Sequence, residues 1–229
     1  MRSGRTLLNL AQELERQLST KKDLVVSSPL VRHSTSEGGA TTLVVEEASG
    51  PATYGVTPLA RRQLADKLNI PYAYFERMRE NQPVLLDRNV NTWLQSEPDR
   101  RLLRTLDGQV RAVLSDRYRR LDNYDLAVHV LPILKGLPEL RFESVELTET
   151  RMYIKCVTPQ LKFEMAPGDV VQAGIVISNS EVGQGTLSVQ PLLYRLVCRN
   201  GLIAADRSLR KTHVGRSLGT EDEGLQVYQ

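Results

Sequence analysis

The sequence is poor in the residues that build disulfides and metal sites. It has two cysteines, Cys156 and Cys198, far apart and without a Cys-x-x-Cys pair or a nearby histidine at metal-ligand spacing. We interpret both as small buried residues in a reducing compartment, and we expect no disulfide and no metal ion. No apolar run reaches the length of about 18 residues that a membrane helix needs, and the N-terminus does not resemble a secretory signal. A cytoplasmic protein without membrane contact is therefore expected.

Motifs for nucleotide binding and hydrolysis are also missing. The sequence has no Gly-x-x-x-x-Gly-Lys-Ser/Thr, no Gly-x-Gly-x-x-Gly after a strand, no His-Glu-x-x-His and no Gly-x-Ser-x-Gly. We interpret His33 as a solvated loop residue and His129 as a core or boundary residue of an apolar helix. His213 lies in a basic string, but a lone histidine without a placed carboxylate or nucleophile is weak support for catalysis. We expect no cofactor and a role that is not enzymatic.

Aromatic residues make up only 5% of the chain, whereas basic residues are plentiful. Of the 30 basic residues, 23 are arginine and 7 are lysine. Arginine presents a planar fork that binds phosphate or carboxylate through two hydrogen bonds. A GC-rich genome would raise arginine usage as well, so the bias alone does not establish an anionic partner.

The first part of the chain predicts helices and a hairpin. Leucines at helical spacing predict an amphipathic helix over 4–20, and strands are expected at 23–27 and 41–47 with a turn-rich stretch between them. Helices follow from Thr57-Pro58, over 71–81 and over 83–96. Two apolar runs flank Asp107-Gly108 and predict a β-hairpin, after which Asp122 is expected to cap a helix with Pro132 inside it.

The pattern changes after residue 138. Short stretches rich in Val, Ile, Tyr and Phe, at 140–147, 151–158, 169–180 and 186–190, predict consecutive antiparallel strands. The polar loop "SNSEVGQG" turns the chain between strands. "PLLYRLVCRN" is expected to form a helix, with Pro191 in its first turn and Gly201 beyond its end, although it could also continue a strand.

The fold class expected is α+β, an antiparallel sheet of consecutive strands packed with helices. We expect a helical and hairpin region over 1–136, a region of sheet, helix and basic segment over 137–218, and an acidic tail over 219–229. One domain for the whole chain is the alternative.

Two basic clusters stand out. The stretches 100–120 and 195–216 each carry a net charge of +5. A dense basic stretch suits binding to the phosphates of nucleic acid, although such clusters are as often solvated surface. Tyr118 and Tyr194 lie within the clusters and could stack on an unpaired base. The residues that we predict to bind nucleic acid are Arg117, Arg119, Arg120, Arg195, Arg199, Arg207, Arg210, Lys211, His213 and Arg216.

Three pieces of the sequence carry a resemblance to a known family. They are "LSDRYRRLDNYDLAVHVLPIL", "AGIVISNSEVGQGTLSVQPLLYRLVCRNGLI" and "RKTHVGR", which together cover roughly residues 100–216. In this order they resemble the phage- and plasmid-associated family of unknown function numbered 932. A looser similarity, of sheet order and basic residues, links the chain to the Rad52-type single-strand annealing proteins. That similarity implies a Rad52-like core, a ring or filament of copies, and no need for ATP.

The leading hypothesis is therefore a phage or plasmid protein that binds single-stranded DNA as a homo-oligomer and promotes annealing or recombination without ATP. A host or phage replication protein is a further expected partner. One alternative is a protein-binding module, an anti-defence or host-takeover factor with an arginine-rich face for an acidic partner. Another is an enzyme of unfamiliar type that uses His213, Asn179 and Asn200 on a phosphate-bearing substrate.

Overall fold

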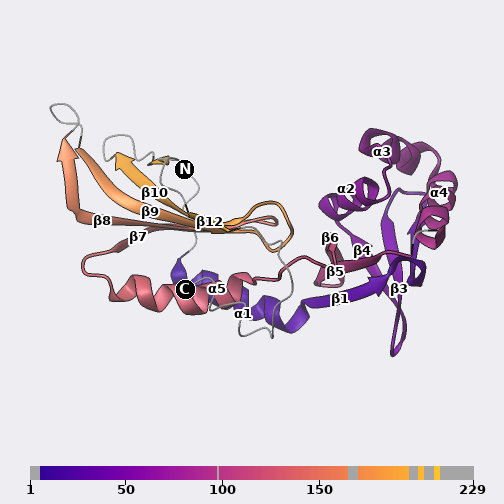
Figure 1. Ribbon diagram of the computed structural model, residues 1–229, viewed down its shortest axis with the longest axis horizontal. Coiled ribbons are helices and arrows are strands. Elements are labelled where there is room, and N and C mark those ends of the chain that lie inside the picture. Colours follow the sequence, from indigo (N-terminus) through magenta and orange to yellow (C-terminus); the bar gives the residue numbers. More distant parts are fainter. Residues whose placement is uncertain (1–5, 97, 165–169, 196–200, 204–208, 212–229) are drawn as a thin grey trace. The chain divides into compact units, whose positions relative to one another are not determined.

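The computed structural model describes residues 6–96, 98–164, 170–195, 201–203 and 209–211. The chain divides into two compact units (Figure 1). Unit 1 comprises Met1–Arg16 and Arg119–Gln229, and unit 2 comprises Gln17–Tyr118. The domain boundary expected at 136/137 stays a prediction, and the acidic tail lies outside the described residues.

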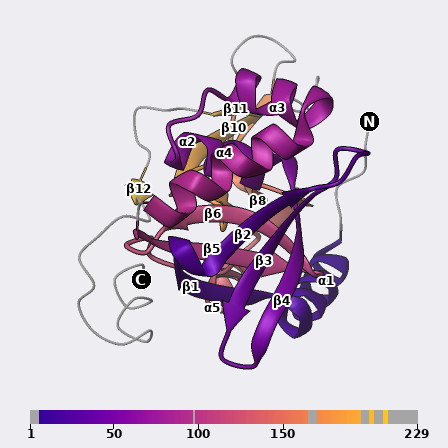
Figure 2. The same ribbon diagram turned by 90° about the vertical axis from the view of Figure 1, so that its right-hand side faces the viewer.

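Unit 2 is a six-stranded sheet with three helices packed on one face (Figures 1 and 2). The strand order is β1-β5-β6-β4-β3-β2, and every pairing is antiparallel except β4 with β6. Its strands are β1 (Lys22–Ser27), β2 (Val31–Thr35), β3 (Thr41–Glu47), β4 (Gly50–Val56), β5 (Arg100–Leu106) and β6 (Gln109–Ser115). A short 3₁₀ turn (Ser28–Leu30) links β1 to β2, and the helices are α2 (Pro58–Lys67), α3 (Tyr72–Asn81) and α4 (Pro83–Ser96).

Local signals account for these elements. Thr57 accepts a hydrogen bond from the Ala60 amide through its side chain, and Pro58 takes the first helical position, as predicted for α2. Asp107 and Gly108 both adopt positive φ at the tip of the β5–β6 hairpin, also as predicted. β2 and β4 were not predicted, because their sequences are polar or contain glycine.

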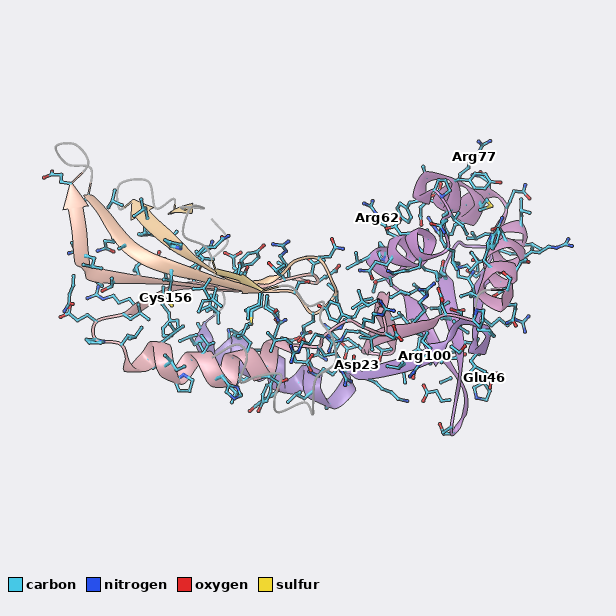
Figure 3. The ribbon with its side chains drawn as sticks, viewed as in Figure 1. Asp23, Glu46, Arg62, Arg77, Arg100 and Cys156 are labelled. Atoms are coloured by element: carbon cyan, nitrogen blue, oxygen red, sulfur yellow. The ribbon has the colours of Figure 1, made fainter. Side chains whose placement is uncertain are left out.

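Unit 1 is an antiparallel sheet with helices on one face (Figure 1). The order is β11-β10-β9-β8-β7, and β12 pairs with the same edge of β10 as β11 does. The strands are β7 (Arg141–Leu147), β8 (Met152–Glu164), β9 (Val170–Asn179), β10 (Leu187–Arg195), β11 (Gly201–Ile203) and β12 (Leu209–Lys211). The helices are α1 (Leu7–Thr20) and α5 (Asn123–Gly136), and Cys156 lies between the sheet and α5 (Figure 3). The predicted α+β class is confirmed.

Strand alternation determines what this sheet buries. Met152, Ile154 and Cys156 of β8 face the helices and join Leu10 and Leu14 of α1 in one apolar core. At Gly174 of β9 an added Cβ would lie 2.2 Å from the backbone oxygen of Cys156, so β8 and β9 approach each other there as only glycine allows.

The helix predicted for "PLLYRLVCRN" is wrong within the described residues. Pro191–Arg195 continue β10, where Leu192 and Tyr194 are buried and Tyr194 pairs with Gln172 of β9. Pairing with β9 on one side and β11 on the other decides the conformation, because Leu, Tyr and Val accept either helix or strand. Residues 196–200 lie outside the described residues.

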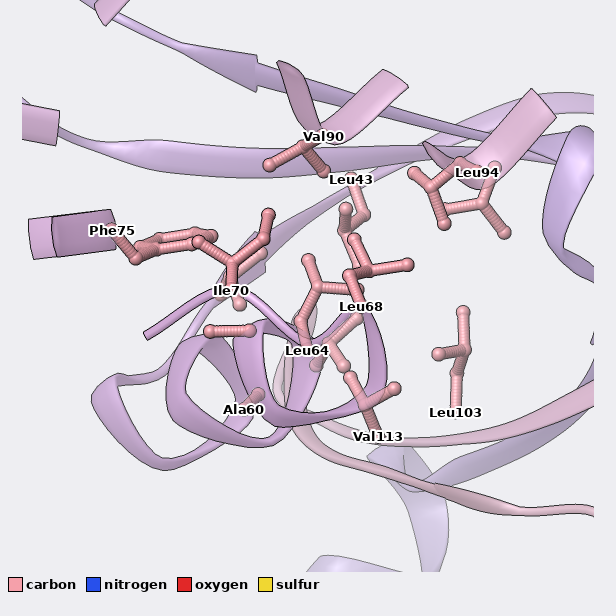
Figure 4. Close-up of a cluster of buried hydrophobic side chains, with 14 of the residues drawn as sticks. Leu43, Ala60, Leu64, Leu68, Ile70, Phe75, Val90, Leu94, Leu103 and Val113 are labelled. Carbon is pink, nitrogen blue, oxygen red and sulfur yellow. The ribbon is translucent and has the colours of Figure 1, made fainter. Parts of the chain in front are cut away.

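The core of unit 2 is formed by the three helices against the strands (Figure 4). Leu64 and Leu68 from the α2 region, Phe75 from α3 and Val90 from α4 meet Leu43 of β3 there. Burial of one such leucine or phenylalanine side chain contributes roughly 1.5–3 kcal/mol, so each helix is fixed chiefly by this face.

Candidate nucleic-acid interface

One face of the unit 1 sheet carries no described helix. Tyr153, Lys155 and Val157 of β8 point to it, in register with Ser178, Val176 and Gly174 of β9. Val157, Val176, Leu192 and Tyr194 are nevertheless buried and form a small apolar cluster on this face. The face is thus partly an apolar layer and not an open basic surface.

Tyr194, near the end of β10, reaches across this face to β7. Its hydroxyl donates to Glu143 Oε1 of β7 at 2.5 Å, although β10 and β7 are three strands apart in the sheet. Strands are about 4.8 Å apart, so a flat sheet would separate them by roughly 14 Å and both side chains must reach across the face. Tyr194 is therefore a buried hydrogen-bonded residue, and the prediction that it could stack on a base is not supported. Tyr118 is half-buried, and its amide donates to the Ser115 carbonyl at 3.0 Å.

Three of the predicted binding residues lie on β10 or on β12, which pairs with the outer side of β10. Arg195 ends β10 opposite Val171, and β12 places Arg210 opposite Ser188 and Lys211 opposite Leu187. From position 187 to position 195 an extended strand rises by about 26 Å, at roughly 3.3 Å for each residue. These three residues therefore lie near the two ends of β10 and do not form a single compact patch. Four other predicted binding residues lie outside the described residues: Arg199, Arg207, His213 and Arg216.

The cations around the hairpin belong to both units, and some of them are buried or paired. Arg117 lies in a turn of unit 2, whereas Arg119 and Arg120 belong to unit 1 just before α5. Arg104 is fully buried, and its guanidinium donates two hydrogen bonds to the Asp23 carboxylate, at 2.9 and 3.0 Å. Arg101 pairs with Asp99 at 2.8 Å. Exposed arginines remain in unit 2, among them Arg62, Arg77 and Arg100 (Figure 3).

The "SNSE" loop forms a buried polar network at the start of α5. Glu181, 3% exposed, accepts the Asn123 amide through Oε1 at 2.6 Å. Asn179 donates to the Leu121 carbonyl and to Asn123 Oδ1, both at 3.0 Å. A carboxylate at the first amides of a helix accepts a hydrogen bond from an N–H that has no partner within the helix. Its negative charge also interacts favourably with the helix dipole. The loop joins β9 to β10, as predicted. Glu181, which was not predicted as a site residue, supplies the carboxylate at the α5 N-terminus.

The same network bears on the predicted enzyme alternative. The amide of Asn179 is 1% exposed and engaged by two acceptors, so it is held as a structural residue. Asn200 and His213 lie outside the described residues. Asp122 occupies the N-cap position of α5, but its side chain does not make the capping hydrogen bond that was predicted.

The interpretation of His33 as a solvated loop residue is wrong. His33 lies in β2 and is 1% exposed, with its Nδ1 2.8 Å from Asp87 Oδ1 and its ring edge against Phe75. Burial lowers the pKa of His33 below its usual range, although the charge of Asp87 opposes this shift. The sequence did carry a signal: Val31, His33 and Thr35 are at alternate positions, which is the spacing of one face of a strand.

Cys156 is buried as predicted, and desolvation raises its pKa to about 11. His129 is half-buried in α5, where its Nδ1 lies 2.8 Å from the Asp125 carbonyl oxygen. Cys198 is outside the described residues.

Across the described parts of both units, no three acidic, histidine or cysteine side chains are grouped to hold a metal ion. None of the helices described is long and apolar enough to cross a membrane.

Comparison with known proteins adds one match. No curated protein and no solved structure matches the chain. The family match begins within β6 and takes in α5, the strands of the unit 1 sheet and the "SNSE" loop. It supports the resemblance expected from the sequence but not the looser one to Rad52-type proteins. Residues 110–217 match the family described as Domain of unknown function (DUF932).

Proposed function

We propose that this chain binds single-stranded DNA along the outer edge of β10 and, as a homo-oligomer in a phage or plasmid context, promotes annealing without ATP. The observation that carries the proposal is that Arg195 ends β10, while Arg210 and Lys211 lie on β12, which pairs with the start of β10. The length from position 187 to position 195, about 26 Å, equals roughly eight phosphates at the 3.4 Å spacing of a stacked strand. The expectation of an oligomer that anneals strands comes from the analogy with the Rad52-type proteins.

In the proposed mechanism no covalent bond is made or broken. Each guanidinium or ammonium group neutralises a phosphate and releases a counterion, which supplies most of the affinity and makes it dependent on salt. The contacts lie on the sugar-phosphate backbone, so the bases stay accessible to a complementary strand. Assembly of several copies would hold a longer strand extended, which favours pairing over self-folding.

The proposal is tested by fluorescence anisotropy of labelled oligonucleotides over a salt series, with duplex DNA alongside. We expect single strands to bind more tightly than duplex, and affinity to rise with length up to about eight nucleotides for each protein copy. Arg195→Ala, Arg210→Ala and Lys211→Ala should each lower the slope of log K against log salt by about 0.7. Arg32→Ala, at an exposed position of β2, is the matched control and should leave the slope unchanged.

Strand annealing is measured with the same variants, using two complementary oligonucleotides without nucleotide triphosphate. Loss of annealing in parallel with loss of binding supports the mechanism. No binding of single strands at low salt refutes it, and co-purification of one host protein free of nucleic acid would then support the protein-binding alternative.

A further inference from the structure

A cavity of about 300 Å³ opens in unit 2 between the end of α2, α3 and α4. Its volume is at the lower limit for a small-molecule site and suits one ring system better than a helix or a strand. The side chains that line it and matter to the argument are Leu68, Asn69, Ile70, Tyr74, Asn89 and Trp93.

The floor of the cavity is fixed before any ligand binds. Leu68 and Ile70 are 5% and 7% exposed and belong to the core of unit 2 (Figure 4). Between them Asn69 adopts a left-handed φ of 53°, and the Ile70 amide donates to the Ala65 carbonyl at 2.9 Å. This arrangement ends α2 with a Schellman motif, which holds the Asn69 backbone in one conformation.

The walls combine two aromatic rings with amides. Tyr74 of α3 and Trp93 of α4 are 48% and 44% exposed, unusually high for aromatic side chains of this size. Asn89 lies four residues before Trp93, so both are on one face of α4. Its Oδ1 is buried and has no hydrogen-bond partner in the described structure, and a buried amide without a partner costs free energy. A ligand that combines a flat face with polar edge groups satisfies both features.

We propose that this cavity receives one unpaired nucleobase of the bound single strand, stacked on Trp93 or Tyr74 with its edge at the amides of Asn69 and Asn89. Every base has a flat face for stacking, and carboxamides form hydrogen bonds with base edges. Arg77 is exposed and lies three residues after Tyr74 on α3, which places a cation on that side of the helix for the adjoining phosphate (Figure 3). This inference rests on the proposed function for the source of the base.

The test uses the full-length chain and the fluorescence of Trp93, which is the only tryptophan. We expect oligo-dT and oligo-dA to quench this fluorescence at the concentrations at which anisotropy reports binding. An oligomer of abasic sites, with the same phosphates, should bind without quenching. Tyr74→Ala and Asn89→Ala should each weaken base-dependent binding by about fivefold or more. The control is Val84→Ala, which should bind normally. Val84 is 81% exposed, lies on α4 with Asn89 and Trp93, and does not line the cavity.

The outcomes separate this inference from the proposed function. Oligonucleotide binding without any change in Trp93 fluorescence, or quenching equal to that of the abasic oligomer, overturns the cavity as a base site and leaves the proposed function standing. If nucleoside monophosphates quench Trp93 but no oligonucleotide binds, the base does not come from a bound single strand. That result also overturns the proposed function. Retention of base-dependent binding in both Tyr74→Ala and Asn89→Ala also refutes the assignment.

Discussion

The buried ion pair between Arg104 and Asp23 gives a sharp test of how unit 2 is held together. Substitution Asp23→Asn keeps the size of the side chain but removes the negative charge that accepts two hydrogen bonds from a fully buried guanidinium. Breaking a buried pair in this way costs roughly 3–5 kcal/mol. Because the Asp23 side chain is 16% exposed and water can reach it, we expect a value at the lower limit, about 3 kcal/mol.

The assay is urea and thermal unfolding at neutral pH followed by the fluorescence of Trp93. This residue is the only tryptophan and lies in unit 2, so its signal reports on that unit even if the two units unfold separately. For a unit of about 100 residues, a loss of 3 kcal/mol corresponds to a fall in Tm of roughly 12–24 °C.

Two further variants make the reasoning refutable. Asp99→Asn removes the carboxylate that pairs with Arg101. Because the Asp99 side chain is 61% exposed, the free energy of unfolding should fall by less than about 1 kcal/mol. Replacing both buried partners, Asp23→Leu with Arg104→Met, should recover much of the loss because no unpaired charge remains. If Asp23→Asn and Asp99→Asn destabilise unit 2 equally, Arg104 is not held in the way described.

Three other predictions concern single residues. Gly174→Ala should destabilise the protein by more than about 2 kcal/mol in urea unfolding because its Cβ meets the backbone of β8, whereas Gly136→Ala, in open space near the end of α5, should be neutral or stabilising by up to about 1 kcal/mol. The lowered pKa of His33 means that the unfolded chain takes up a proton first as the pH falls, so stability is full above pH 6.5 and declines below it; His33→Gln should reduce this pH dependence of the urea midpoint. In a Cys198→Ser background, Cys156 should not react with a thiol reagent at pH 8 until the protein is unfolded, because its pKa is about 11.

Local signals in the sequence were enough for much of the fold. The N-cap Thr57 with Pro58 and the Asp107-Gly108 turn determine conformation through nearby atoms, so the elements that they start or join were predicted correctly. "PLLYR" has no such signal, and its conformation depends on pairing with β9, which no local pattern encodes. The same holds for β2 and β4, whose partners are distant or whose residues are polar.

The candidate site was less accessible from the sequence, because charge alone does not indicate which arginines are exposed. Arg104 and Arg100 belong to one basic stretch, yet the first is fully buried on Asp23 and the second is exposed. Both residues point to the same face of β5, so strand alternation does not distinguish them, and only the neighbouring elements decide which one is covered. Asn89 and Trp93 carry no sequence motif, and they form a cavity wall only because α4 packs beside α3.

The two edges of the unit 1 sheet differ in a way that bears on how copies of this chain assemble. Beyond β10 the edge is formed by β11 and β12, which the structure describes over three residues each, and very short edge strands offer little to a pairing chain. Pro191 of β10, between the two paired stretches, has no amide hydrogen to offer. The opposite edge strand, β7, carries the exposed charges Arg141, Glu143 and Glu146. Charged side chains on an edge strand discourage pairing with another chain. Growth of the sheet from one copy into the next is therefore disfavoured at both ends, and the oligomer that we propose has to form through helices, loops or side-chain contacts.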